Sequence, residues 1–158
     1  MDGKVEMLRH ATATLAYRAG KAMRGAPADF AGFQAGPGSR TPAQILAHLG
    51  DLFDWALRMC DGSREWTNSP VSAWEDAVTR FFAALEAFDR RLAADAPLGY
   101  PAEKIFQGPI ADALTHTGQI AMLRRVAGHQ IKGESYFAAN IAVGRVGLEQ
   151  AAPVIEFE

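Results

Sequence analysis

The fold is decided by residues 41–60, TPAQILAHLGDLFDWALRMC, in which apolar side chains recur every three to four positions. This period is typical of an amphipathic helix. Thr41 supplies a hydroxyl that can cap a helix, and Pro42 suits the first helical position, where its missing N–H costs nothing. We therefore predict a helix over residues 42–60. His48 falls on the apolar face of this helix, and a polar side chain placed there needs a partner.

The same period predicts three further helices, over residues 5–24, 71–95 and 109–127. Gly108 and Pro109 are expected to open the last of them. The strongest apolar stripe belongs to the helix over 71–95, and it consists of Val71, Trp74, Val78, Phe81, Phe82, Leu85, Phe88 and Leu92. Four helices of this length predict an all-α four-helix bundle.

The segments between the helices are rich in glycine, proline and polar residues. We expect a long irregular first loop, a polar turn over residues 61–70, and an extension over residues 133–158. Within the extension, residues 135–142 are predicted to form a short helix, and only the closing VIEFE alternates like a strand. The bundle and its extension are treated as one domain covering residues 1–158.

The composition is that of a globular protein. The 158 residues are 49% hydrophobic and 22% charged, which suits one domain with a substantial core. The net charge is -2 and the two Arg-Arg doublets stand beside acidic or apolar residues, so no nucleic-acid partner is expected. The N-terminus lacks a signal peptide's apolar region and no stretch approaches about 18 apolar residues, so we expect a cytoplasmic protein without a membrane partner. Cys60, the only cysteine, excludes an internal disulfide and a Cys-based zinc cluster.

The candidate chemistry lies in residues 108–125, GPIADALTHTGQIAMLRR. Asp112 and His116 are four residues apart, which separates them by only about 40° around a helix axis. With His48 they would supply two imidazoles and one carboxylate to a metal ion and leave positions open for water or substrate. These ligand types are compatible with zinc, nickel, iron and manganese, of which we expect zinc or nickel.

Each of these three residues also has a simpler explanation. A lone histidine on an apolar face is more often a core residue bonded to a carbonyl, and a carboxylate near a helix start can be explained by the helix dipole. Asp112 could also hydrogen-bond His116 or a ligating water without touching the metal. Asp51, one turn after His48, stays open as an alternative ligand.

The other histidines have plainer roles. His10, four residues after Glu6, is expected on a solvated face of the first helix. His129 lies just beyond Gly128, where the last helix should stop, and a cation there suits the helix C-terminus. The sequence contains no H-E-x-x-H, no G-x-S-x-G and no phosphate-binding glycine loop.

Several neighbouring side chains could assist a reaction. Gln119, close after His116, is the candidate catalytic residue because it could orient a ligand. Arg124 and Arg125 could meet an anionic substrate, although a solvated last turn of the helix explains them more simply. An apolar pocket could be lined by aromatic residues, namely Trp55, Trp66, Tyr100, Phe106 and Tyr136.

Two segments carry a resemblance to a known family, residues 43–57 (AQILAHLGDLFDWAL) and 112–128 (DALTHTGQIAMLRRVAG). They resemble the DinB/YfiT-like superfamily of bacterial four-helix-bundle metalloproteins. The signature of that family looks like one histidine on the second helix, and then H-x3-H followed by Gly, Gln and an apolar residue on the fourth. His48 matches the first part and His116 with the Gly-Gln-Ile after it matches the second. Asp112 stands where the family has another histidine.

The resemblance implies a divalent metal held by His48 and His116, and a reaction such as thiol-dependent S-transfer with a low-molecular-weight thiol as cosubstrate. A carboxylate at 112 lowers the formal charge of the site by one, which makes a bound metal a weaker Lewis acid. We therefore expect a metal-dependent transferase or hydrolase that activates water or a thiol for attack on a small-molecule substrate. The alternatives are a non-catalytic metal- or small-ligand-binding bundle with a vestigial site, and a stress-related interaction protein acting as a homodimer.

Overall fold

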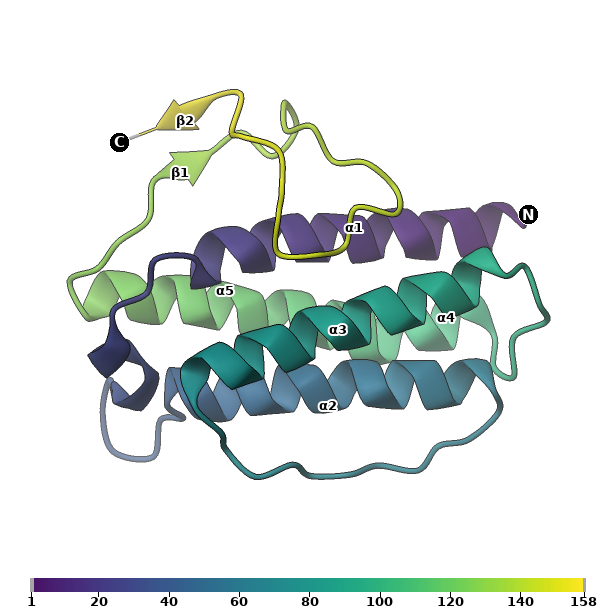
Figure 1. Cartoon of the computed structure of the whole chain (residues 1–158), viewed down its shortest axis with the longest axis horizontal. Coiled ribbons are helices and arrows are strands. Elements are labelled where there is room, and N and C mark those ends of the chain that lie inside the picture. Colours follow the sequence, from purple (N-terminus) through teal and green to yellow (C-terminus); the bar gives the residue numbers. More distant parts are fainter. Residues whose placement is uncertain (1, 158) are drawn as a thin grey trace.

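The computed structural model describes residues 2–157, and its main feature is four helical rods packed side by side (Figure 1). The first three rods are α1 (Gly3–Met23), α2 (Pro42–Cys60) and α3 (Trp74–Ala93). The fourth combines α4 (Ala102–Ile105), a π-helical turn (Phe106–Ile110) and α5 (Ala111–Val126). The prediction of an all-α chain with four helices is confirmed.

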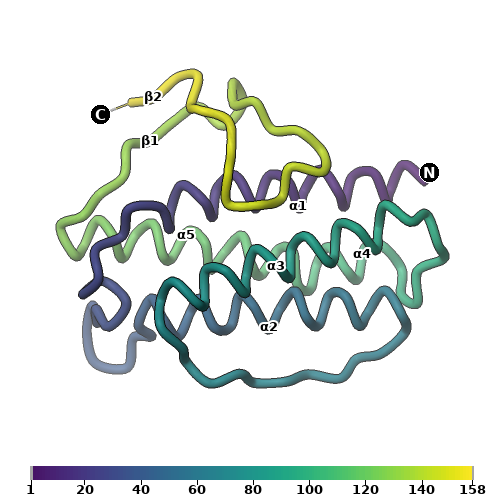
Figure 2. Tube along the Cα trace, in the orientation of Figure 1, coloured from purple at the N-terminus to yellow at the C-terminus, as the bar shows by residue number. Residues whose placement is uncertain are grey.

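The order of the helices around the bundle is α1, α3, α2, α5, because α2 packs against α3 and α5, and α1 packs against the same two helices. α2 and α3 run in one direction, and α1 and α5 run in the other (Figures 1 and 2). Residues 61–73 must therefore return along the outside of the bundle, from the end of α2 to the start of α3. The sequence predicts only a turn over 61–70, and this prediction was wrong. The polar composition of this segment indicates that it is exposed. It does not indicate whether the segment makes a tight turn or crosses the length of the bundle.

α2 begins and ends where the sequence predicts. The Thr41 hydroxyl accepts a hydrogen bond from the Gln44 N–H at 3.2 Å, and the Gln44 side chain accepts one from the Thr41 N–H at 2.9 Å. This reciprocal pair satisfies two N–H groups that the first helical turn leaves unpaired. α3 begins later than predicted, at Trp74, and Val71 is 53% exposed in the preceding connection.

The fourth rod begins well before the predicted position 109. Pro109 lies inside the rod rather than at its start. Because proline has no N–H to bond the preceding turn, the backbone widens into the π-helical turn and continues. Gly108 faces Trp55 of α2, since a β-carbon at this glycine would lie 3.5 Å from the indole ring. The prediction that residues 108 and 109 open this helix was wrong.

The core fills the space between the four rods. Phe53 of α2 meets Phe81 and Phe88 of α3 edge-on, with ring centroids 6.1 and 5.5 Å apart. The stripe predicted for α3 is buried from Val78 onward. Met7 of α1 lies outside this core, because it is 63% exposed.

The first loop is partly ordered by its own contacts. It contains a short 3-10 helix (Ala28–Gly32), and Phe30 in this helix is buried edge-on against Trp74 at the start of α3. The loop then turns at Gly36–Ser39, where the Ser39 hydroxyl donates a hydrogen bond to the Gly36 carbonyl at 2.8 Å. None of the helices within residues 2–157 is long and apolar enough to cross a membrane.

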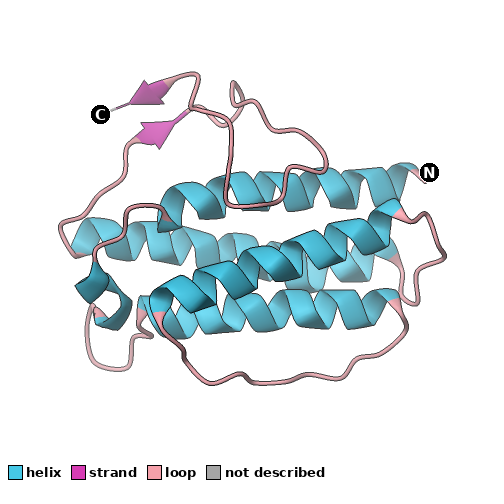
Figure 3. Cartoon of the chain, in the orientation of Figure 1, coloured by secondary structure: helices cyan, strands magenta, loops and turns pink. Residues whose placement is uncertain are grey.

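The extension forms turns and a small sheet instead of the predicted helix over 135–142. β1 (Gly133–Glu134) pairs with the antiparallel β2 (Glu156–Phe157), drawn in magenta in Figure 3. The buried Glu134 carboxylate accepts hydrogen bonds from the Tyr17 hydroxyl and the Lys21 ammonium of α1, both at 2.8 Å. Burial, helped by this carboxylate, raises the pKa of Tyr17 to about 12. Polar contacts with α1 therefore hold the extension, which explains why helical periodicity failed there.

Candidate metal site

The side chains of His48, Asp112 and His116 meet between α2 and α5. Asp112 Oδ2 lies 3.3 Å from His48 Nε2 and 3.5 Å from His116 Nε2. The two imidazole rings are nearly perpendicular, with their centroids 4.7 Å apart. One donor atom from each residue lies within 4.8 Å of the other two, so the group could hold a metal ion.

These distances suit a small divalent ion. Ligand atoms about 2.0–2.1 Å from zinc at tetrahedral angles stand about 3.3 Å apart. The separations of Asp112 from the two imidazole nitrogens, 3.3 and 3.5 Å, are close to that spacing. The His48 and His116 side chains are 23% and 13% exposed, and Asp112 is 46% exposed. The carboxylate therefore stands at the mouth of the group, with the imidazoles deeper.

Gln119 fixes which nitrogen of His116 faces Asp112. The Gln119 side-chain oxygen lies 2.7 Å from His116 Nδ1, a contact that favours the tautomer in which Nδ1–H donates to this oxygen. In a neutral imidazole with that tautomer, Nε2 presents a lone pair to the Asp112 carboxylate. Two acceptors facing each other repel unless a cation or a proton lies between them. The donor set therefore fits a metal ion, and Gln119 has the position of a residue that orients a ligand to it.

Residues 61–73, which cross the outside of the bundle from α2 to α3, are called the crossing connection. Aromatic rings from this connection and from α2 lie near His48. The Trp66 ring lies 5.5 Å from the His48 ring and 5.7 Å from the Trp55 ring, measured between centroids. Trp66 Nε1 donates to Asn68 Oδ1 at 2.9 Å. Trp66 thus packs beside the His48 ring and limits its rotation. The Trp55 indole N–H is buried and has no hydrogen-bond partner in the described part of the chain.

A hollow of about 520 Å³ opens beside the two imidazoles. Its walls come from the end of the first loop, from α2 and from α5. Besides the histidines, the lining includes Arg40, Ile45, Gln119, Met122 and Leu123. This volume falls in the range of about 300–1,000 Å³ that is usual for small-molecule sites. A molecule in the hollow would reach the imidazoles directly.

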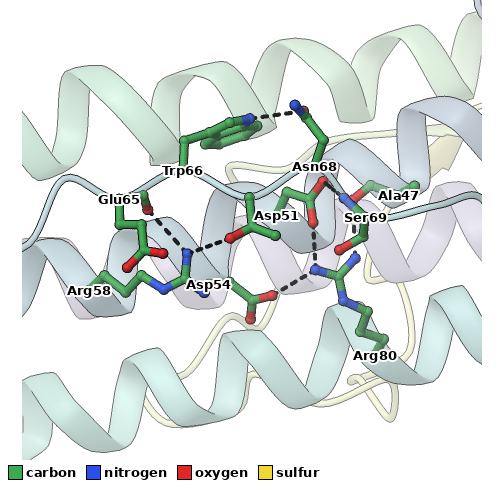
Figure 4. A network of polar contacts seen from close by, with 10 residues as sticks. Ala47, Asp51, Asp54, Arg58, Glu65, Trp66, Asn68, Ser69 and Arg80 are labelled. Atoms are coloured by element: carbon green, nitrogen blue, oxygen red, sulfur yellow. Dashed lines mark hydrogen bonds and ion pairs between the residues drawn. The ribbon is translucent and has the colours of Figure 1, made fainter.

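Asp51, the alternative ligand, is bound elsewhere. It is 5% exposed and accepts hydrogen bonds from Arg80 Nη2 at 2.6 Å and from the Ser69 N–H at 2.9 Å (Figure 4). Burial alone would raise the pKa of Asp51, but the hydrogen bonds from Ser69 and Arg80 outweigh it and lower the pKa. Arg80 also pairs with Asp54 at 2.6 Å. Asp51 therefore belongs to a polar network that joins the crossing connection to α2 and α3.

The other reactive side chains lie outside the site. Glu6, His10 and His129 are exposed, in agreement with the prediction of solvated positions. Burial raises the pKa of the Cys60 thiol to about 11, which leaves it protonated near neutral pH. Arg124 is not solvated as predicted, because it is 6% exposed and donates to the carbonyls of residues 22 and 24. It therefore joins α5 to the end of α1 and does not face a substrate.

The five aromatic residues predicted to share a pocket are dispersed. Trp55 and Trp66 lie near His48, but Tyr136 contacts Tyr17 in the extension. Tyr100 and Phe106 line other hollows at the N-terminal end of α1. The lining of the site is instead aliphatic, with one arginine that sequence reasoning missed. Arg40 directly precedes Thr41, the residue that caps α2. Its closeness to the start of the helix that carries His48 was the only feature of the sequence that could have placed it near the site.

Comparisons of this chain with protein-family models, with curated proteins and with solved structures give no match. The resemblance to DinB/YfiT-like proteins therefore rests on the motifs around His48 and His116. What the site could do chemically follows from its own geometry, which combines three convergent side chains that could hold a metal ion with an adjoining hollow.

Proposed function

We propose that this chain is a DinB-like metal-binding protein that holds a divalent ion through His48, Asp112 and His116. The observation that carries the proposal is the approach of His116 Nε2 to the Asp112 carboxylate at 3.5 Å, with Gln119 at 2.7 Å from the other ring nitrogen. A cation between the neutral imidazole and the carboxylate makes a favourable contact with both. His48 Nε2, 3.3 Å from the same carboxylate oxygen, completes a set of three ligands from two helices.

The ligand set favours zinc or nickel, and iron and manganese are also compatible. Two imidazoles and a carboxylate are borderline and hard donors that all four ions accept. The carboxylate leaves a divalent ion with a net positive charge, although a smaller one than three imidazoles would leave. The first prediction of this assignment is therefore metal binding itself, and the identity of the ion is for the experiment to decide.

We further propose that the site is catalytic, of transferase or hydrolase type. A bound divalent ion would lower the pKa of a coordinated water or thiol and so supply a nucleophile near neutral pH. In thiol transfer, the S–H proton passes to solvent, the sulfur forms a bond to an electrophilic carbon, and the leaving group departs with its electron pair. The hollow supports this version over a vestigial site, because a vestigial site would be closed over by apolar side chains.

The chain's own residues have distinct tasks in this proposal. Gln119 holds the tautomer of His116 through its 2.7 Å contact with Nδ1. Trp66 limits the orientations of His48. Asp112, as the most exposed of the three ligands, stands where the exchangeable positions meet solvent.

Metal content tests the binding proposal. Untagged full-length protein is reconstituted with zinc, nickel, iron and manganese separately, and bound metal is measured by elemental analysis. Near-stoichiometric metal is expected for the wild type and for His10→Ala and His129→Ala, which remove exposed histidines outside the site. His48→Ala and His116→Ala, confirmed as folded by circular dichroism, should lose it.

Asp112→Ala separates two versions of the site. Loss of metal equal to that of the histidine variants makes Asp112 a ligand, whereas partial retention makes it a hydrogen-bonding neighbour of a ligand. No metal with any of the four ions, or equal loss in His10→Ala and His48→Ala, would overturn the proposal.

Thiol consumption tests the catalytic version. The metal-loaded protein is incubated with a low-molecular-weight thiol and a chloroacetamide electrophile, and free thiol and released chloride are followed together. Catalysis should require bound metal and disappear in His116→Ala. Equal rates with and without protein across thiols, together with no hydrolysis of ester substrates, would leave a non-catalytic metal-binding bundle.

A further inference from the structure

Arg40 brings a positive charge to the hollow beside the metal-binding group. It lies at the end of the first loop, directly before the residue that caps α2, and it is exposed. The turn at Gly36–Ser39 and the capping box at Thr41 fix the backbone on both sides of it. The direction in which Arg40 leaves the backbone is therefore set by ordered structure.

No acidic side chain within residues 2–157 pairs with Arg40. Three other arginines are paired with carboxylates. Arg80 pairs with two carboxylates, Arg9 pairs with Asp89, and Arg91 pairs with Asp61. Asp51, which shares a smaller hollow with Arg40, is already neutralised by Arg80. The charge of Arg40 is therefore available to a ligand.

Three side chains of the lining are apolar. Met122 of α5 is 60% exposed, and Leu123 and Ile45 also line the hollow. An exposed methionine in a concave wall gains from burial, and its flexible side chain adapts to varied shapes. The hollow thus offers a positive charge, apolar side chains and the two imidazoles.

We propose that this hollow binds a small organic carboxylate with an apolar body. The carboxylate pairs with the Arg40 guanidinium, which matches it with two parallel N–H donors. The apolar body lies against Met122, Leu123 and Ile45, and the far end of the molecule reaches His48 and His116. This assignment rests on the proposed function, because that far end carries the group that reacts.

Other ligand classes fit the hollow less well. An ammonium group would be repelled by Arg40 and by a metal held at the histidines. In the metal-free protein a phosphate carries more charge than the Arg40 guanidinium neutralises, and the other arginines and lysines lie outside the lining of this hollow. A neutral molecule would use the apolar side chains but leave Arg40 without a partner. Arg40 therefore favours a monoanion.

Three probes of the same shape test the charge selection. 4-Phenylbutanoate, 4-phenylbutanamide and 4-phenylbutan-1-amine are titrated into the full chain, both metal-free and zinc-loaded, and followed by ligand-observed NMR. The carboxylate should bind at least about tenfold more tightly than the amide, as expected for a charge-assisted pair, and the amine should bind most weakly. Arg40→Ala should abolish the advantage of the carboxylate, and Arg40→Lys should restore part of it.

Two further variants serve as controls. Arg125→Ala removes an exposed arginine of α5 outside the hollow and should leave all three affinities unchanged. Met122→Ala should weaken the carboxylate and the amide by a similar factor, because it removes apolar contact and no charge. Since both side chains are exposed, neither substitution threatens the core.

The outcomes distinguish this inference from the proposed function. Zinc bound at the histidines with equal affinities for carboxylate and amide would overturn the carboxylate site alone. An Arg40-dependent preference in protein that binds no metal would overturn the metal proposal alone. Absence of binding by all three probes at 5 millimolar, on the order of the weakest affinities NMR detects, would also overturn the carboxylate site.

Discussion

Two polar clusters project from α2 within one turn of each other, and they differ in how completely their charges are satisfied. His48 faces α5, and Asp51, about 60° further around the helix, faces α3. Around Asp51 both carboxylates contact a cation, because Arg80 pairs with Asp51 and Asp54 (Figure 4). Around His48 the Asp112 carboxylate meets two imidazoles, and no arginine or lysine within residues 2–157 pairs with it.

The difference separates a structural network from a candidate site. The Asp51 cluster is closed, since its hydrogen bonds join α2, α3 and the crossing connection. Gly50 makes room for it, because a β-carbon there would come within 2.8 Å of Arg80 Nη1. The His48 cluster opens on a hollow, and its three side chains could hold a cation. The comparison teaches that unsatisfied polar groups, more than polar groups as such, mark a candidate site.

The largest expected effect is on stability in the presence of metal. Zinc at a thousand times its Kd should stabilise the wild type by about 4.1 kcal/mol, which for a chain of this size raises Tm by about 8–16 °C. His48→Ala should lose this shift, whereas Arg80→Ala should keep it from a lower starting Tm. Differential scanning calorimetry with and without zinc measures both. An equal shift in His48→Ala and the wild type would contradict the separation of the two clusters.

Removal of Arg80 should give the next largest effect. In Arg80→Ala the carboxylate of Asp51, 5% exposed, stays buried with only the Ser69 N–H as partner. We expect a loss of about 2–3 kcal/mol in the free energy of unfolding, measured by urea denaturation, with metal content unchanged. Arg58→Ala is the matched control, because Arg58 makes exposed contacts to the same connection and should cost less than about 1 kcal/mol. Loss of metal in folded Arg80→Ala would mean that the clusters are coupled.

The pH dependence of stability should sharpen the contrast. Because the pKa of Asp51 is lowered in the folded protein, its stabilising effect is complete above the unfolded value of about 3.9 and disappears as the pH falls through the folded pKa. Asp51→Asn should therefore cost about 1.5–2 kcal/mol at pH 7, and progressively less as the pH falls below about 3.9. Asp54→Asn, whose side chain is 43% exposed, should cost under about 1 kcal/mol at pH 7. A cost for Asp51→Asn that does not change with pH in urea titrations would contradict this reading.

The smallest expected effect concerns Gln119, which touches a proposed ligand but not the metal. Gln119→Leu removes the acceptor of the His116 Nδ1 proton and should weaken zinc binding about tenfold. Gln119→Glu keeps an acceptor at this position and should retain the affinity or increase it. Competition with a chromophoric chelator measures both constants. Equal affinities for the leucine variant and the wild type would leave Gln119 without a role in the site.

The sequence determined the parts of this fold that depend on local chemistry. Thr41 and Pro42 predicted the start of α2 because capping acts within one turn. Gly128 predicted the end of the last helix for a similar reason, and it has a φ of 82° that favours glycine. The juxtaposition of positions 112 and 116 followed from helical geometry alone, and the expected approach of His48 to them agrees with the 3.3 Å contact to Asp112.

Only the tertiary structure decided which polar residues are satisfied and which are not. Asp51 and His48 both lie on the inner part of one helix, and no local pattern separates the carboxylate held by Arg80 from the imidazole facing Asp112. Segments distant in sequence also decide three other features. These are the path of residues 61–73 across the bundle, the burial of Arg124 and the position of Arg40 at the hollow. The physical reason is that periodicity and capping act over one or two turns, whereas the charge balance of a site is set by which elements the whole chain brings together.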